Sequence, residues 1–422
     1  MSNPTKKRRS RASRRIRREL RGRPEVIRLL VVSRLLRVLD RAGLQRYAEK
    51  HGRVWPLEDG TDAVDPSPLS GPIQPAPPRD ADLVVSAPMP WTNEPDFVCE
   101  LKDVSLIGTK PIAVTSDGGF VLDSIAPGRA GNVRLEKTLR STAVKHGFAR
   151  MRSGFRDDER IDWRELGLVC VLTSGLQRSY YHWVLEQLTK LRAVDEFRRR
   201  TGETPALIVP RGRNPWMREL IALVGYGDAR LIKWQGGDAR AERVVLPSFP
   251  MPTPASCRWL RERVVGPDEE APAERTERIL IARGEGRRWW RRMIVNQDEV
   301  EEALRPLGFR CHKLGEMSVA EQAELFSRAE VIVGSHGAGF TNMVFSTGAK
   351  VVELFGRDVR PHFFRLAHTL GLPYRYVLCK PVAVEGMPRR EDGSRVAVAD
   401  SLFGLHVDVE ELKRVLVEIG VR

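Results

Sequence analysis

Apolar and polar positions follow two patterns along the chain, and the change between them divides the sequence. Between residues 104 and 122, short apolar or β-branched pieces are separated by glycine, which is typical of strands. From Gly167 onward, short apolar runs alternate with stretches in which apolar residues return at helical spacing. Such alternation predicts a parallel sheet covered by helices. The expected strands of this part are 104–107, 112–115, 120–122, 168–172, 206–209, 230–233 and 243–246, with helices at 179–200 and 215–224.

A second run of alternating strands and helices begins near residue 278. Prolines cluster around residue 250, so the sequence predicts two α/β domains in series, residues 96–250 and 251–400, followed by a C-terminal helix in 401–422. Two such domains face each other across a cleft, with ligands at the carboxyl ends of the strands. Three capping boxes mark expected helix starts: Asn296 with Glu299, Ser318 with Glu321, and Asp408 with Glu411. The expected strands are 279–282, 309–314, 331–333, 350–354 and 376–378, and two of the helices should run over 318–330 and 409–419.

The N-terminal region differs in composition from the rest of the chain. Residues 1–23 hold eleven Lys or Arg and one Glu, so this arm carries ten of the fifteen net positive charges. Within residues 1–55, apolar residues at helical spacing between Val26 and Leu39 alternate with arginines, which predicts a basic amphipathic helix. That helix could lie on an anionic membrane surface or pack on the protein, and the arm could equally be a solvated tail without a partner. Residues 56–95 contain ten of the 28 prolines and read as an extended linker or surface wrap.

Cysteine use and apolar run length exclude several classes. The five cysteines are dispersed and form no Cys-x-x-Cys pair, which argues against a disulfide framework and a cysteine zinc site and fits a reducing cytoplasm. No uncharged apolar run approaches the ~20 residues that span a bilayer. The sequence therefore favours a protein without a membrane span, located in the cytoplasm.

The strongest local signal is a glycine-rich turn that directly follows an apolar strand. Glycines at 334, 337 and 339 permit positive φ angles and close approach of the backbone. The expected helix after the turn presents free N–H groups, and His336 could add a donor, so the turn suits a phosphate or diphosphate. A tight turn without a ligand fits the same spacing. The candidate binding residues here are Ser335, His336, Gly337, Ala338, Gly339 and Asn342.

Two further groups of residues could serve chemistry. Arg283 ends an expected strand ahead of a run of arginines and tryptophans at 287–292, where it is placed to clamp a diphosphate. In the helix 179–200, His182 and Glu186 lie one turn apart on a polar stripe, the arrangement of a general base with an orienting carboxylate. An ordinary hydrogen-bonded histidine on a surface helix has the same spacing. The Asp-x-Asp form occurs at Asp80, inside the proline-rich linker, and we interpret it as accidental.

These segments resemble the family 61 glycosyltransferases over roughly residues 100–380. The most specific likeness is Gly-x-His-Gly-Ala-Gly, followed by an aromatic-rich helix and a Val-Glu-Leu strand. The family's strand-ending Arg, its later Arg and its Asn before a helix match Arg283, Arg292 and Asn296. The His-Trp-x-x-Glu pattern matches His182 and Glu186. Bacterial members of this family are often described as capsular polysaccharide biosynthesis proteins.

The resemblance implies a GT-B fold, in which two Rossmann-like domains face each other and the C-terminal one holds the donor. It implies an inverting, metal-independent transfer without a cofactor, from a nucleotide diphosphate sugar, most often a UDP-sugar, to a hydroxyl of a surface glycan or glycolipid. His182 or Glu186 is then the candidate base, and Glu353 is expected to contact the ribose. Residues 1–41 would place the protein at the inner face of the cell membrane.

Two other functional classes fit the residues as well. One is an anion-binding protein without catalysis that acts through the basic arm; nucleic acid is the less favoured partner, because the remaining 399 residues carry only five net positive charges. The other is a GT-B-fold sugar-nucleotide epimerase.

Overall fold

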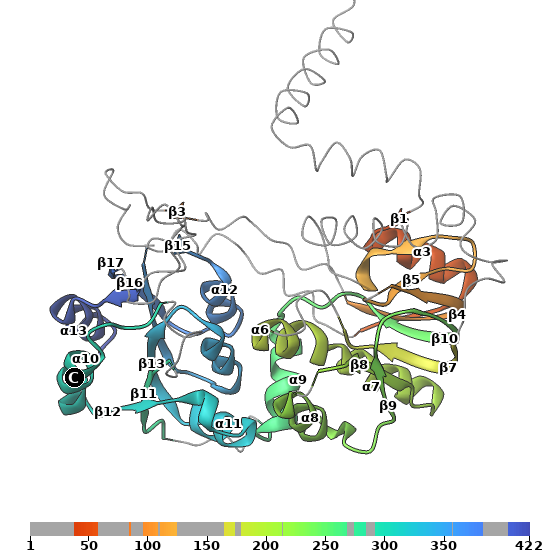
Figure 1. Ribbon diagram of the computed structural model, residues 1–422. Helices are drawn as coiled ribbons and strands as arrows, with labels where there is room; N and C mark the ends of the chain where they lie inside the picture. Colours follow the sequence, from red (N-terminus) through yellow and green to blue (C-terminus); the bar gives the residue numbers. More distant parts are fainter. Residues whose placement is uncertain are drawn as a thin grey trace, which may run out of the picture.

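The computed structural model describes residues 38–57, 84–85, 96–108, 110–124, 164–173, 179–212, 214–267, 274–283, 292–356, 358–382 and 404–422. Within these ranges the chain forms two α/β units that lie side by side (Figure 1). The basic arm and the linker's Asp80 fall outside them. Leu39, expected at the end of the basic helix, is buried in a short strand instead, where its partner is Val121.

The first unit is built on a mixed sheet. Strands β10, β7, β8 and β9 are parallel, and β4 pairs with β10 in the antiparallel sense. Numbered along the chain, the parallel strands stand in the order 3-2-1-4, the order with which doubly wound sheets begin. In space the strands are β1 (Val38–Leu39), β6 (Phe120–Val121), β5 (Ile112–Val114), β4 (Phe97–Ile107), β10 (Asp238–Pro247), β7 (Arg164–Val171), β8 (Ala206–Pro210) and β9 (Leu231–Trp234), with β2 (Arg53–Pro56) beside β4.

Helices and helical turns connect and flank these strands. The expected helix over 179–200 is confirmed, but its middle is wound as a π-helix, a form that is rare and frequent at functional sites. Its apolar stripe is buried, as Val184, Leu188 and Leu191 are fully inaccessible. The helical elements are α3 (Arg41–His51), η2 (Leu122–Ser124), α6 (Tyr180–His182), η3 (Trp183–Leu188), α7 (Lys190–Thr201), α8 (Pro215–Ile221), η4 (Ala222–Tyr226) and α9 (Pro254–Val264).

The second unit contains a sheet whose strands are all parallel in the described part of the chain. Numbered along the chain, the strands stand in the order 2-1-3-4-5, so the order reverses between β11 and β13. In doubly wound sheets, ligands bind at such a switch point, outside the carboxyl ends of the strands. In space the strands are β12 (Phe309–His312), β11 (Glu277–Ile281), β13 (Ala329–Ser335), β14 (Lys350–Phe355) and β16 (Tyr374–Leu378).

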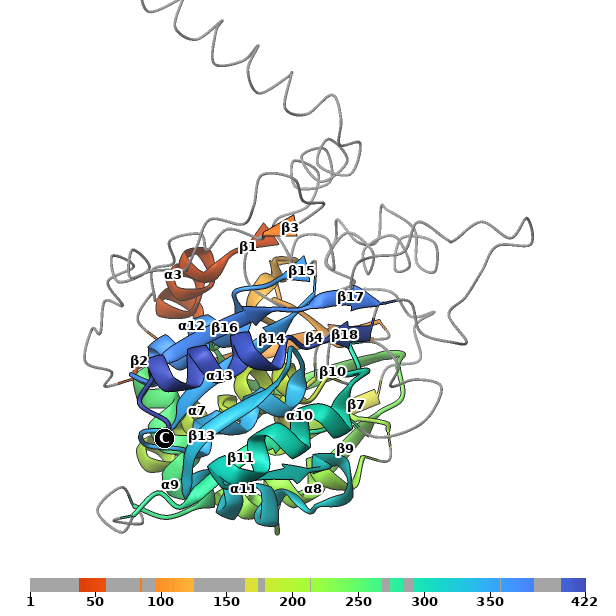
Figure 2. The ribbon, with the colours of Figure 1, turned by 90° about the vertical axis from the view of Figure 1, so that its left-hand side faces the viewer.

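Helices cover both faces of this second sheet. Figure 2 shows α10 and α13 in front of the sheet, on the face turned away from the first unit. The capping box of Ser318 with Glu321 is confirmed, and Asp408 caps α13 with its side chain. The elements are α10 (Gln297–Leu304), η6 (Arg305–Leu307), η7 (Leu314–Glu316), α11 (Val319–Ser327), η8 (Ala338–Phe345), α12 (His362–Thr369) and α13 (Val409–Glu418).

Two short strand pairs add to the second unit. β15 (Asp358–Val359) pairs with β3 (Val84–Val85), a piece of the proline-rich linker. β17 (Lys380–Val382) pairs with β18 (Gly404–His406). The linker therefore touches the second unit just ahead of α12, as expected of a surface wrap.

The apolar core has three parts, and the largest belongs to both units. It runs from Leu185 and Leu220 of the first unit through Leu260 of α9 to Ala323 and Phe340 of the second. The other two clusters fill the outer faces of the two sheets. Helix α9 packs on η4 of one unit and η8 of the other, so the units meet through packed side chains.

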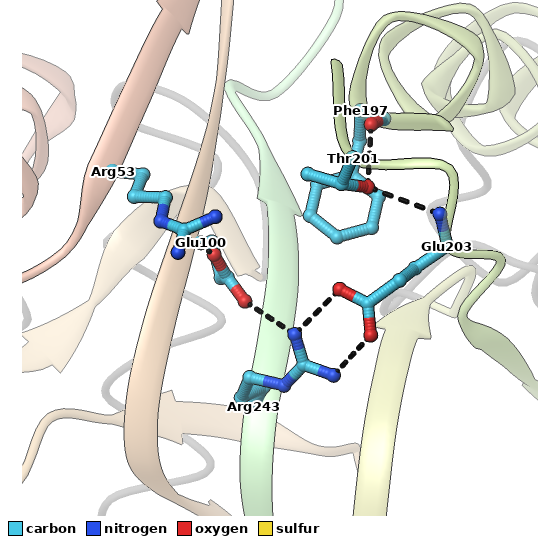
Figure 3. Close-up of polar contacts among 6 residues, drawn as sticks. All are labelled: Arg53, Glu100, Phe197, Thr201, Glu203 and Arg243. Atoms are coloured by element: carbon cyan, nitrogen blue, oxygen red, sulfur yellow. Dashed lines mark hydrogen bonds and ion pairs between the residues drawn. The ribbon is translucent and has the colours of Figure 1, made fainter. Parts of the chain in front are cut away.

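A charged cluster fastens the first sheet to the end of α7 (Figure 3). Arg243 of β10 donates two hydrogen bonds to Glu203, at 2.7 and 2.5 Å, and a third, at 3.0 Å, to Glu100 of β4. Glu100 is nearly inaccessible, and Arg53 lies 3.6 Å away on its other side. Because the carboxylate of Glu100 is buried, the guanidinium of Arg243 is needed to stabilise its charge.

The described residues include all the cysteines as well as helices that could be considered for a membrane span. All five cysteines lie among them as free thiols. None of the described helices is both long and apolar enough to cross a membrane.

Candidate functional site

Two arginines converge on the turn that follows β13. Arg283, just after β11, donates from Nη2 to the backbone oxygen of His336 at 2.6 Å and from Nε to Oγ of Ser335 at 3.1 Å. Arg292 donates to the same oxygen of His336 at 3.1 Å. Since β11 and β13 flank the point where the strand order reverses, both guanidinium groups lie where this fold class binds ligands.

The charge of Arg283 is not neutralised by a carboxylate among the described residues. Burial, with the positive charge of Arg292 beside it, lowers the pKa of Arg283 to about 10. Arg292 has a φ of +59°, a left-handed conformation that is unusual for a non-glycine residue and often found at functional sites. Two guanidinium groups on one neutral carbonyl form a place where an anion is strongly favoured.

The glycines of the turn allow neighbouring side chains to approach the backbone closely. None of Gly334, Gly337 and Gly339 adopts the left-handed backbone that glycine permits, so close approach is the property that the turn uses. A Cβ on Gly337 would lie 2.3 Å from Nη2 of Arg283, and one on Gly334 would lie 2.9 Å from Cβ of Ile281. Gly334 and Gly337 have no room for a Cβ, because Ile281 of the neighbouring strand and the guanidinium of Arg283 occupy that space. Ala338, at its tip, is exposed.

The imidazole ring of His336 is oriented by a buried carboxylate. Its Nδ1 lies 2.5 Å from Oε1 of Glu353, whose other oxygen accepts a hydrogen bond from the hydroxyl of Tyr374 at 2.6 Å. Glu353 is fully buried, and both its oxygens are used. The expected contact of Glu353 with ribose is therefore wrong, because the carboxylate faces inward and orients the imidazole. Burial, and then the charge of Glu353, raises the pKa of Tyr374 well above its usual value, so the phenol stays a donor.

Two expected donor-binding residues have structural roles instead. Both ends of the Asn342 amide are engaged: Oδ1 accepts from the hydroxyl of Tyr180 at 2.8 Å, and Nδ2 donates to Gln322 at 2.7 Å. Asn342 thus joins the two units. Asn296 makes two hydrogen bonds with the backbone of Val407 and one with the carboxylate of Glu299. Its side chain caps no helical N–H, so the expected capping box there is wrong.

The His–Glu pair of the first unit is formed as expected. Nδ1 of His182 lies 2.6 Å from Oε1 of Glu186, and both side chains are partly exposed. A carboxylate can only accept, so the proton of this hydrogen bond is on Nδ1, and Nε2 is the ring nitrogen that takes no part in it. The pair follows β7, beside the place where the parallel strand order of the first sheet reverses.

The places where the strand order reverses in the two sheets lie on either side of the start of α12, a helix that the sequence pattern does not predict. The His362 ring lies 6.0 Å from that of Tyr181 and 6.4 Å from that of His336, between centroids. Tyr181 adjoins His182, with ring centroids 5.2 Å apart. The structure thus brings His182, His336 and His362 together from three elements. No periodicity or motif marks His362, so its position could not be found in the sequence. Among the described residues, no group of three His, Cys, Asp or Glu could hold a metal ion.

The described residues define a doubly wound α/β protein in which two arginines converge on the His336 turn, near a His–Glu pair of the first unit. Residues 180–352 match the model of a protein family described as Glycosyltransferase 61. This match begins in the helix of His182 and ends in β14, so it includes Arg283, Arg292 and the turn of His336. Residues 180–352 are therefore similar to this family in the part of the chain that holds both groups of site residues.

A plant enzyme is similar to a smaller part of the chain. The chain is 31% identical over 94 residues to the beta-1,2-xylosyltransferase RCN11 of Oryza sativa subsp. japonica. The aligned stretch covers 20% of this chain and 18% of the rice protein, so it spans about a fifth of that relative's length. Both comparisons support a glycosyltransferase.

Proposed function

We propose that the protein is an inverting glycosyltransferase that moves a sugar from a nucleotide diphosphate sugar to a hydroxyl group. The two units would act as a GT-B pair, with the donor on the second unit and the acceptor against the first. The observation that carries the proposal is the convergence of Arg283 and Arg292 on the His336 turn, at the switch point of the second sheet, opposite the His182–Glu186 pair.

The proposed reaction is a single displacement. Nε2 of His182 takes the proton of the acceptor hydroxyl while that oxygen attacks the anomeric carbon. The bond from the anomeric carbon to the diphosphate breaks, and its electron pair leaves with the diphosphate. Arg283 and Arg292 stabilise the charge that develops there, beside the His336 imidazole that Glu353 orients. Such preorganised donors are worth about 10²–10³ in rate each.

Donor binding is tested first with nucleotides alone. We expect one nucleoside diphosphate from a set of UDP, GDP, CDP and dTDP to raise the melting temperature by a few degrees, with or without EDTA. Saturation at 100 times the dissociation constant corresponds to about 2.7 kcal/mol. Arg283→Met should abolish the shift, whereas Arg310→Met, on an exposed position of the same sheet, should keep it. A flat response of the wild type to all four nucleotides would contradict the proposal.

The base is tested separately from donor binding. His182→Gln should keep the nucleotide-induced shift and lose most of the transfer to an acceptor, because an amide cannot take the proton. Wild-type turnover by this variant would show that His182 is not the base. Turnover of the donor to an epimer in the absence of any acceptor would identify an epimerase instead.

The donor sugar is proposed from the rice relative, and the acceptor from the basic N-terminal residues. The name of the rice relative supports a pentose donor, and UDP-xylose is the first donor to assay. A surface glycan or glycolipid acceptor on the cytoplasmic side fits the basic residues 1–41, which would bind anionic liposomes in a salt-dependent way. Equal binding to neutral liposomes would contradict that role of the arm.

A further inference from the structure

The start of α12 is fixed between the two units, and His362 is its first residue. The next residue, Phe363, is buried and packs on three rings: those of Tyr181 (5.6 Å between centroids), His336 (5.3 Å) and Phe340 (5.5 Å). These contacts come from both units, so they hold the backbone at His362 in place. The residue His362 keeps part of its surface exposed, so a ligand can reach it.

His362 stands between the two halves of the proposed chemistry. Its ring neighbours are His336, on the diphosphate side, and Tyr181, which adjoins the proposed base His182. In a single displacement the anomeric carbon lies between the base and the leaving diphosphate. A side chain held between those two groups therefore borders the space that the transferred sugar must occupy.

The protonation state of His362 suits a neutral polar ligand. Desolvation of the part of His362 that its neighbours cover, followed by electrostatic repulsion from His336, His182, Arg360 and Arg365, lowers the pKa of His362 to about 4. The imidazole is then neutral at physiological pH, with one nitrogen donating and the other accepting. A sugar hydroxyl also donates and accepts, whereas a diphosphate only accepts and is better served by Arg283 and Arg292.

We propose that His362 hydrogen-bonds a hydroxyl of the transferred sugar and so helps to select the donor sugar. This inference rests on the proposed function, because it needs a donor on the His336 turn. It gives His362 a role in specificity that is separate from binding the nucleotide.

The experiment compares the affinities for UDP and UDP-xylose by titration calorimetry on the full chain. His362→Ala should weaken UDP-xylose binding about tenfold, the equivalent of one hydrogen bond, and leave UDP binding unchanged. His362→Gln, which keeps a donor and an acceptor, should recover part of the loss. The matched control is His368→Ala, on the same helix, which should change neither affinity.

The outcomes separate this inference from the proposed function. If His362→Ala lowers both affinities equally, or changes neither, the sugar contact is wrong while UDP binding by the wild type still supports the donor site. If the wild type binds neither ligand, the inference and the UDP-sugar donor are both wrong. A melting temperature equal to that of the wild type confirms that each variant is folded.

Discussion

A single methyl group on Gly337 would test whether the position of Arg283 matters for transfer. The backbone there is extended, with φ 174° and ψ 171°, so alanine can adopt it. The new Cβ would lie 2.3 Å from Nη2 of Arg283, whereas ordinary contact begins at 3.4 Å. The guanidinium must therefore move by about 1 Å, and its 2.6 Å hydrogen bond to the His336 oxygen is lost.

The expected effect of Gly337→Ala is on catalysis rather than on folding. A misplacement of about 1 Å in a catalytic group costs about 10²-fold, which corresponds to about 2.7 kcal/mol in the barrier. The free energy of unfolding should change by less than ~1 kcal/mol, because the displaced atom is the end of a flexible side chain. The measurements are kcat/KM for transfer, with the donor concentration varied up to saturation, and a urea denaturation curve.

Gly348→Ala is the matched control for this experiment. Its Cβ would lie 2.4 Å from Nη2 of Arg275, so it creates a similar clash with an arginine, away from the His336 turn. We expect its kcat/KM to stay within about twofold of the wild type. The reasoning is refuted if Gly337→Ala keeps full activity in a folded protein, or if both variants lose activity equally.

Three further predictions concern stability. Burial lowers the pKa of Lys190 from 10.5 to about 8, so the unfolded chain holds this proton over a pH range in which the folded chain has released it. Stability from this group should rise between pH 8 and 10.5 by up to about 3 kcal/mol, and urea denaturation of Lys190→Met should lack that rise. Arg243→Met leaves the buried Glu100 without its closest cation and should cost about 3 kcal/mol in the same measurement; a loss under ~0.5 kcal/mol would contradict the assigned role. Tyr180→Phe and Asn342→Ala should show a coupling of about 1 kcal/mol in a double-mutant cycle, and simple additivity would mean that their hydrogen bond contributes nothing.

Local pattern was sufficient to predict most elements after residue 164, because each strand and helix there is marked by its own apolar spacing and caps. It predicts lengths for β4 and β10 that are too short. These two strands are extended by pairing with each other, from Val98 with Pro247 to Ile107 with Asp238, although they lie far apart in the sequence. The π-helical winding after His182 was not predicted either, because it changes the hydrogen-bond pattern and leaves the apolar stripe intact.

Residues at strand ends were the predictable part of the site. Arg283 and His336 follow neighbouring parallel strands, and the topology brings such residues together. Glu353 and Asn342 lie close to the turn in the sequence, but their roles depend on the partners they face, Tyr374 and Tyr180, which lie elsewhere in the sequence. His362 reaches the site only through the packing of α12, which no spacing records.

The apolar core shared by the two units has a consequence for recombination. Cutting the chain near residue 250 would separate α9, with Leu260, and Phe340 of η8 from residues such as Leu185 and Leu220, with which they form one cluster. A chimera that took its two units from different relatives would then contain mismatched packing at this junction. Exchange of one unit is therefore expected to require compensating changes in the shared core.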